Sequence, residues 1–178
     1  LRLLRSRTDP ADLAGIRSIL ETVRIRFDPS GKIFLDGEDV SDTLRSAEVN
    51  SMVSTVAGLP VVRKHMQKLQ RETGSEGGVV LDGRDIGSAV FPDAEYKFYL
   101  DASLEERARR RMNDSKEKVF ADLEAIQQDI ARRDAADSQR EHSPLVRAED
   151  AQYIDTTGMG PEMVVSAMLE YIDRRSVR

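Results

Sequence analysis

Two short, uninterrupted apolar runs, each followed by an aspartate, constrain the fold of this chain most. They are Val79–Leu81 and Phe98–Leu100, and Tyr153–Ile154 is a third candidate. Runs of this kind are typical of strands that are covered on both faces, as in a parallel sheet. Segments with helical spacing alternate with the runs, so the sequence predicts an α/β fold in which helices flank a parallel sheet.

Helix signals surround these runs. Asp9, Pro10 and Asp12 predict a helix start with Asp9 as its cap. Ser103 and Glu106 form a capping box at the start of an arginine-rich helix. Apolar residues at helical spacing predict further helices within residues 49–57, 60–69, 119–130 and 164–172.

A second pattern, with a period of two, precedes the apolar runs. Val23, Ile25 and Phe27 alternate with polar residues, which predicts a half-buried strand. The turn signals Asp28–Gly31 and Asp36–Gly37 flank a second strand and lead to a short third one. The sequence therefore predicts a small antiparallel meander inserted into the α/β fold.

Composition excludes several function classes. The 178 residues include no cysteine and two histidines far apart in sequence, so disulfides, cysteine-based zinc sites and a His-Glu-x-x-His site are absent. No window approaches 18 consecutive apolar residues, which predicts no membrane span, and the lack of cysteine favours a cytoplasmic location. The net charge of −5 argues against a nucleic-acid coat protein.

The basic residues are nevertheless mostly arginine, whose planar group grips phosphate or carboxylate with two hydrogen bonds. On the excess alone, a bias in the composition of the genome is the favoured explanation, and binding of small anions is the alternative.

The first candidate site follows Val79–Leu81, where Asp82 and Asp85 flank Arg84 around a glycine turn. Ligands of open parallel sheets bind beyond the carboxyl ends of the strands. Charges at that place favour a binding site, and the alternative is a salt bridge that caps the next helix.

Two further clusters lie on predicted helices. Arg133, Asp137 and Arg140 share one helical face, and so do Arg107, Arg110 and Arg111. The first face suits a phosphate and a ribose hydroxyl, and the second suits a ligand with several phosphates. Solvated helix faces with local ion pairs are the alternative for both clusters.

The motif Gly-x-x-x-x-Gly-Lys-[Ser/Thr], whose amides and lysine hold nucleoside triphosphates, does not occur in these 178 residues. The single Gly-Lys pair is Gly31-Lys32, and Ile33 follows it.

Four stretches resemble the bacterial cytidylate (CMP) kinases. They are Leu35–Ser41, Leu81–Ala94, Phe98–Ala108, and Arg133-Asp134 with Asp137 and Arg140. The resemblance runs through essentially the whole chain. It implies the fold of a P-loop nucleoside monophosphate kinase, with a core of residues 1–20 and 70–178, an NMP-binding insertion of residues 21–69, and a helical lid at about residues 107–120.

The resemblance also implies roles for particular residues. Ser54, Arg63 and Asp85 are expected to recognise cytosine, and Asp137 is expected to bind the ribose. Arg84, Arg133 and Arg140 are expected to bind phosphate, and the lid residues Arg107, Arg110 and Arg111 are expected to close on the transferring phosphates. Asp82 is a candidate for a link to Mg²⁺. The implied reaction moves the γ-phosphate of ATP to CMP or dCMP with Mg²⁺ as cofactor, and such transfer depends mainly on positioning and charge neutralisation.

The chain departs from the family pattern at its start. Family members begin with a strand, the P-loop and a helix, and these 178 residues begin after that block. We expect an enzyme whose first strand and P-loop are absent from the given chain, which by itself turns over negligibly. The alternatives are a non-catalytic nucleotide-binding or interaction module and a related kinase for UMP or dCMP. The intact enzyme is expected to be a monomer without nucleic-acid or membrane partners.

Overall fold

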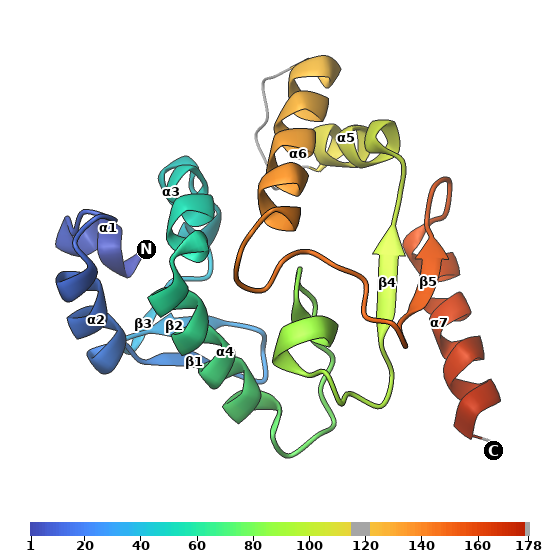
Figure 1. Cartoon of the computed structure of the whole chain (residues 1–178), viewed down its shortest axis with the longest axis horizontal. Helices are drawn as coiled ribbons and strands as arrows, with labels where there is room; N and C mark the ends of the chain where they lie inside the picture. Colours follow the sequence, from blue (N-terminus) through green and yellow to red (C-terminus); the bar gives the residue numbers. More distant parts are fainter. Residues whose placement is uncertain (115–121, 177–178) are drawn as a thin grey trace. The chain divides into compact units, whose positions relative to one another are not determined.

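The computed structural model describes residues 1–114 and 122–176, apart from the side chains of Arg45 and Ser54. The chain forms two compact units, Leu1–Ser75 and Glu76–Arg178, and each is described by itself. Both contain helices and a small sheet (Figure 1). The α/β composition predicted from the sequence is therefore confirmed.

The first unit begins with two helices, continues through an antiparallel sheet and ends with two longer helices. Its elements are α1 (Arg2–Ser6), α2 (Leu13–Thr22), β1 (Ile25–Phe27), β2 (Ile33–Leu35), β3 (Glu38–Asp39), the 3₁₀ turn η1 (Thr43–Arg45), α3 (Ala47–Gly58) and α4 (Pro60–Gly74). Pro60 opens α4 at its first position, as predicted, because proline needs no hydrogen-bond partner for its nitrogen there.

The predicted meander is confirmed, with strand order β1-β2-β3 and antiparallel pairing throughout. Between β2 and β3, Asp36 and Gly37 have φ angles of 52° and 89°. Two successive residues in the left-handed region are what a tight two-residue hairpin turn requires. The aspartate–glycine pair thus sets the register of the meander.

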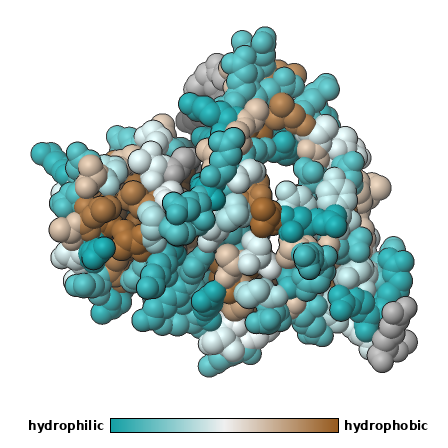
Figure 2. All heavy atoms as spheres, viewed as in Figure 1, coloured by the Kyte–Doolittle hydropathy of each residue, from teal (hydrophilic) through white to brown (hydrophobic). Residues whose placement is uncertain are grey.

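The burial predicted for β1 is wrong. Ile25 is 38% exposed and Phe27 is 60% exposed, so the alternating pattern marks a strand without a buried face. The main buried cluster of this unit is built by helices, from Leu3, Ile16, Leu20 and Val62 of α1, α2 and α4. The sheet contributes Leu35 of β2 to the buried residues and none from β1. Figure 2 shows hydrophobic surface gathered over the region of α1 and α2.

The start of α2 also differs from the prediction. The cap is Asp12, whose carboxylate accepts a hydrogen bond from the Gly15 nitrogen at 2.9 Å. Asp9 instead accepts from the Ala11 nitrogen at 2.8 Å and closes a turn before the helix. Both aspartates suit a cap chemically, and the backbone path decides between them.

The second unit contains a parallel pair of strands and three helices. Its elements are the π-helical turn η2 (Ile86–Val90), β4 (Phe98–Asp101), α5 (Leu104–Asn113), α6 (Leu123–Ser138), β5 (Gln152–Asp155) and α7 (Pro161–Ser176). The β4–β5 register runs from Phe98 opposite Gln152 to Asp101 opposite Asp155. The parallel pairing of these two predicted strands is confirmed.

Two predictions about the apolar runs are wrong. Val79–Leu81 forms no strand, and Val80 is 95% exposed. Within the described residues β4 pairs with β5 alone, so this run has no neighbour to hydrogen-bond with. Coverage of both faces also fails, because Leu100 and Tyr153 are 49% and 42% exposed. The Phe98 ring itself is covered by α7, because it packs edge to face against the Tyr171 ring with the ring centroids 5.5 Å apart.

Helices α5 and α6 pack through a small core of Ala108, Ile126 and Ile130. Ser103 caps α5 by accepting from the Glu106 nitrogen at 3.2 Å. The second bond of the predicted capping box, from the Ser103 nitrogen to the Glu106 carboxylate, does not form. The carboxylate accepts hydrogen bonds from Arg109 and Arg110 instead. Val119, part of the predicted spacing before α6, lies outside the described residues.

The predicted lid, residues 107–120, is described only up to residue 114. Residues 1–20 contact α4 within the first unit, and their assignment to a common core with residues 70–178 stays a prediction. No described helix has the length and the apolar character that crossing a membrane requires.

Candidate functional site

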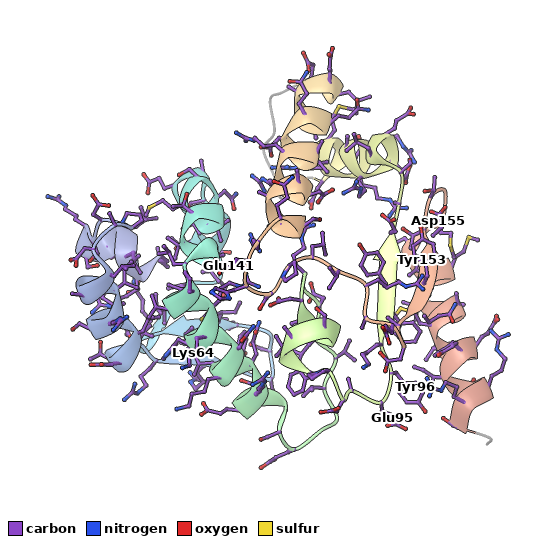
Figure 3. The ribbon with its side chains drawn as sticks, in the orientation of Figure 1. Lys64, Glu95, Tyr96, Glu141, Tyr153 and Asp155 are labelled. Carbon is purple, nitrogen blue, oxygen red and sulfur yellow. The ribbon has the colours of Figure 1, made fainter. Side chains whose placement is uncertain are left out.

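The carboxyl ends of β4 and β5 lead directly into the helices and loops that carry the candidate site. Asp155 closes β5, with Tyr153 two residues before it (Figure 3). The next residue, Thr156, is 5% exposed and donates to the main-chain oxygen of Asp101 from its nitrogen (2.7 Å) and its hydroxyl (2.8 Å). Ser103, the α5 cap, donates from its nitrogen to the Thr157 hydroxyl at 2.9 Å. The first turn of α5 is therefore fixed to both strand ends.

Four arginines line a cavity of about 280 Å³ in this unit. Arg84 comes from the loop before η2, Arg107 and Arg111 from α5, and Arg133 from α6, with Ile130 as the apolar part of the wall. Guanidinium groups are always charged, and such a gathering is unfavourable unless carboxylates or a bound anion offset it. The cavity thus has the chemistry of an anion site.

Asp134 connects two of these arginines. One of its oxygens accepts from Arg84 Nη1 at 2.9 Å, and the other accepts from Arg107 Nη1. Arg107 also donates from Nε to the main-chain oxygen of Ala102, at 3.1 Å. The Arg107 side chain is therefore held at two points, next to the end of β4.

Asp129 does the same for the other two arginines. Its Oδ2 lies 2.8 Å from Arg111 Nη1 and 3.1 Å from Arg133 Nε. Its Oδ1 accepts from Arg132, whose side chain is 79% exposed and does not line the cavity. The four cavity arginines therefore form two pairs, each joined by one carboxylate.

A third carboxylate, Asp137, is 7% exposed. It forms ion pairs with Arg140 and, at 3.5 Å, with Nε of Arg84. Arg133 and Asp137 lie one turn apart on α6, but Arg140 lies beyond the last residue of that helix, so the helical face predicted for all three does not include Arg140. Six arginines, Arg132 included, against three aspartates leave these residues with three net positive charges.

Hydrogen bonds to arginine keep two of these aspartates ionised. Desolvation by burial raises the pKa of Asp134, and hydrogen bonds from Arg107 and Arg84 more than offset it, so that the pKa is lowered. The pKa of Asp129 is also lowered, because bonds from Arg132 and Arg111 outweigh its desolvation. Both groups are therefore anionic at neutral pH.

Arg110 lies in a different environment from its neighbours. It does not line the cavity, and its Nε donates at 2.7 Å to Glu106, a residue that is 9% exposed. Its Nη2 donates to the main-chain oxygens of Thr156 (2.6 Å) and Met159 (3.2 Å). These contacts tie α5 to the loop between β5 and α7.

The remaining predicted residues lie elsewhere. Ser54 is on α3 and Arg63 on α4, both in the first unit, where Arg63 donates to the main-chain oxygen of Ala57 at 3.1 Å. Asp85 precedes η2 and its side chain is half-buried, whereas Asp82 is exposed. The described residues hold no group of three or more histidine or acidic side chains suited to a metal ion.

Sequence reasoning assigned no role to Asp129 or Asp134, although both organise the cavity. The signal for Asp129 was its position four residues before Arg133, where side chains meet on a helix. The bonds from Asp134 to Arg84 and Arg107 span 50 and 27 residues, and no local pattern predicts them.

An arginine-lined cavity has the chemistry that a phosphorylated ligand requires, and the sheets and helices of this α/β protein are consistent with a nucleoside monophosphate kinase fold. The sequence model of the cytidylate kinase family matches residues 1–174. The chain belongs to the cytidylate kinase family.

Individual relatives agree with this family. A cytidylate kinase of Listeria welshimeri is 44% identical over 167 residues, which cover 92% of this chain and 75% of the relative. One from Geobacillus kaustophilus is 45% identical over 178 residues, covering 98% of this chain and 80% of the relative. One from Pediococcus pentosaceus is 41% identical and is covered to 80% of its length.

Proposed function

We propose that the protein transfers the terminal phosphoryl group of ATP to CMP or dCMP, giving CDP or dCDP. The observation that carries this proposal is the cavity lined by Arg84, Arg107, Arg111 and Arg133, together with membership of the cytidylate kinase family. An oxygen of the acceptor phosphate attacks the γ-phosphorus of ATP, and ADP leaves with the bonding electrons. The arginines neutralise the charge spread over the transferring group.

Within this reaction the arginines divide into two groups. Arg84, Arg133 and Arg140 hold the phosphate of CMP, and Arg107 and Arg111 approach the transferring phosphoryl group from α5. Bonds to Asp134 and Asp129 leave both α5 arginines on the cavity wall. Arg110 would have to give up its bonds to Thr156 and Met159 to join them, so its catalytic role stays a prediction.

Recognition of the nucleoside is assigned to carboxylates and to the first unit. Asp137 accepts hydrogen bonds from ribose hydroxyls while its other contacts hold Arg84 and Arg140. Asp85 accepts from the exocyclic amine of cytosine, which uracil lacks, and Ser54 and Arg63 are assigned to recognition of the same base. A site built for such a hydrogen bond discriminates strongly against the base without it.

Mg²⁺ enters this scheme as a complex with ATP and neutralises phosphate charge. This ion is usually held by one or two carboxylates together with substrate phosphates, so a single exposed carboxylate such as Asp82 fits it. A monomeric state and a cytoplasmic location complete the proposal.

Binding of CMP and UMP by titration calorimetry tests the proposal directly. We expect CMP to bind more tightly than UMP, and the Asp85→Ala variant to lose most of that preference while retaining the affinity for the shared ribose phosphate. An unchanged preference in the variant would remove Asp85 from base recognition. Absence of CMP binding by the unaltered chain would contradict the proposed function.

A coupled assay with ATP, Mg²⁺ and CMP tests catalysis separately. We expect negligible turnover from these 178 residues alone, since they contain no Gly-x-x-x-x-Gly-Lys-[Ser/Thr] motif. Robust turnover by a preparation whose first residue is verified as Leu1 would contradict this expectation. A chain that binds CMP selectively without turnover would still carry the acceptor site.

A further inference from the structure

Asp129 and Asp134 each join two of the arginines that line the cavity. Asp134 joins Arg107 to Arg84 with one oxygen for each, and Asp129 joins Arg111 to Arg133 through a single oxygen, Oδ2. The two aspartate side chains are 23% and 24% exposed, which is less than most of the arginines they bind. They lie five residues apart on α6, so the same helix supports both bridges.

Without these bridges the arginines would lose the carboxylates that join them in pairs. Their side chains are between 25% and 49% exposed, so each has room to turn toward solvent. Guanidinium groups repel each other at short range, and an arginine side chain gains rotamer entropy when it is released. A phosphate arriving at a released cluster would have to gather the arginines again, at a cost in affinity.

We propose that Asp129 and Asp134 are positioning residues, which hold the four cavity arginines in an anion-ready arrangement before the ligand binds. This inference rests on the proposed function, because it assumes that a phosphoryl group is the ligand of the cavity. The two aspartates contact the arginines and act through them, and neither one receives or donates a proton in the reaction.

Loss of one of these carboxylates should change the affinity for an anion in the direction opposite to the one that net charge alone predicts. Replacing one aspartate by asparagine raises the net charge of the network by one positive charge. If the carboxylates merely compete with the ligand for the arginines, an anion should then bind more tightly. If they position the arginines, the anion should bind more weakly despite the added positive charge.

The experiment measures the binding of inorganic pyrophosphate to the whole chain by titration calorimetry at fixed salt concentration. We expect Asp134→Asn and Asp129→Asn each to weaken binding about fivefold or more, the cost of immobilising two released side chains. The matched control is Glu124→Gln on the same helix, whose carboxylate accepts a bond from Gln128 at 3.4 Å and touches no cavity arginine. Its affinity should change less than twofold.

A double-mutant cycle separates positioning from a general loss of structure. If Asp134 acts through Arg107, adding Asp134→Asn to Arg107→Ala should weaken binding by much less than it does in the unaltered chain. Thermal unfolding of every variant shows whether it remains folded. If Asp134→Asn does not fold, Asp129→Asn with Arg111→Ala provides the same cycle at the other bridge.

Three outcomes decide the matter. Weaker binding with strong coupling supports the inference. Unchanged or tighter binding by the folded asparagine variants overturns it and leaves the anion site intact. Failure of the unaltered chain to bind pyrophosphate overturns both the inference and the phosphate site on which the proposed function depends.

Discussion

Arg110 Nη2 donates to the main-chain oxygen of Thr156 at 2.6 Å, linking α5 to the loop that follows β5. Its neighbours Arg107 and Arg111 line the arginine cavity instead. Three arginines that share a helical face in the sequence therefore have two different environments, and they should respond differently to substitution.

Replacement of Arg110 by alanine is expected to lower the free energy of unfolding by about 1–3 kcal/mol, because a nearly buried carbonyl and hydroxyl at Thr156 lose a charged donor. Arg109→Ala is the matched control, since Arg109 bonds to Glu106 of its own helix and its side chain is 58% exposed. Urea unfolding of both variants measures the difference. Equal losses would argue against Arg110 as a structural link.

Arg133 and Arg132 provide a test of the cavity itself. Both pair with Asp129, but only Arg133 lines the cavity. Arg133→Ala should weaken CMP binding by about 10- to 100-fold, the equivalent of one hydrogen bond to a charged group. Arg132→Ala should change it less than twofold. Calorimetry measures both, and similar losses from the two variants would mean that overall charge, and not position, determines affinity.

The lowered pKa values of Asp129 and Asp134 predict a pH dependence of stability. Because each folded-state pKa lies below the unfolded-state value, the unfolded chain binds protons first on acidification. The ion pairs therefore contribute fully above the ordinary aspartate pKa of about 3.9 and are lost as the pH falls through the lower folded-state values.

The free energy of unfolding is measured for the unaltered chain and for Asp134→Asn at a series of pH values between 7 and 3. As the pH is lowered, it should fall more for the unaltered chain than for the variant. Parallel curves would show that Asp134 contributes nothing to this dependence.

Two glycines should respond in opposite directions to alanine. Gly37 has a φ of 89° in the hairpin turn, where a side chain is strained, so Gly37→Ala should destabilise the chain by about 1 kcal/mol. Gly58, the last residue of α3, has ordinary helical geometry and open space around it, so Gly58→Ala should stabilise by about 0.5–1 kcal/mol. Thermal unfolding distinguishes them, and the same sign for both would contradict this reasoning.

Local patterns predicted those elements whose signals lie within a few residues. The Asp36-Gly37 turn, Pro60 at the start of α4 and Ser103 as the cap of α5 depend on backbone geometry over a single turn. The spacing of Arg133 and Asp137 also predicted their common side of α6, because a helix repeats every 3.6 residues, but Arg140 lies beyond the end of that helix. Membership of the cytidylate kinase family followed from the same motifs.

Burial and long-range pairing could not be predicted in this way. Val79–Leu81 has the composition of a buried strand but forms no ladder, since a strand exists only where another strand supplies its hydrogen bonds. Phe27 belongs to a segment in which apolar and polar residues alternate, as in a half-buried strand. It is nevertheless exposed, because the main buried cluster of the first unit is built by helices. Apolar content reports a capacity for burial, and the tertiary arrangement decides whether it is used.

The sequence alone thus determined the α/β class, the meander, the arginine clusters and the family, all of which depend on residue types at short spacing. Only the tertiary structure separated Arg110 from Arg107 and Arg111 and brought Asp134 to Arg84 and Arg107. The physical reason is that a guanidinium binds whichever oxygen reaches it in the folded chain. The partners of an arginine are therefore a property of the packing of α5, α6 and the strand ends.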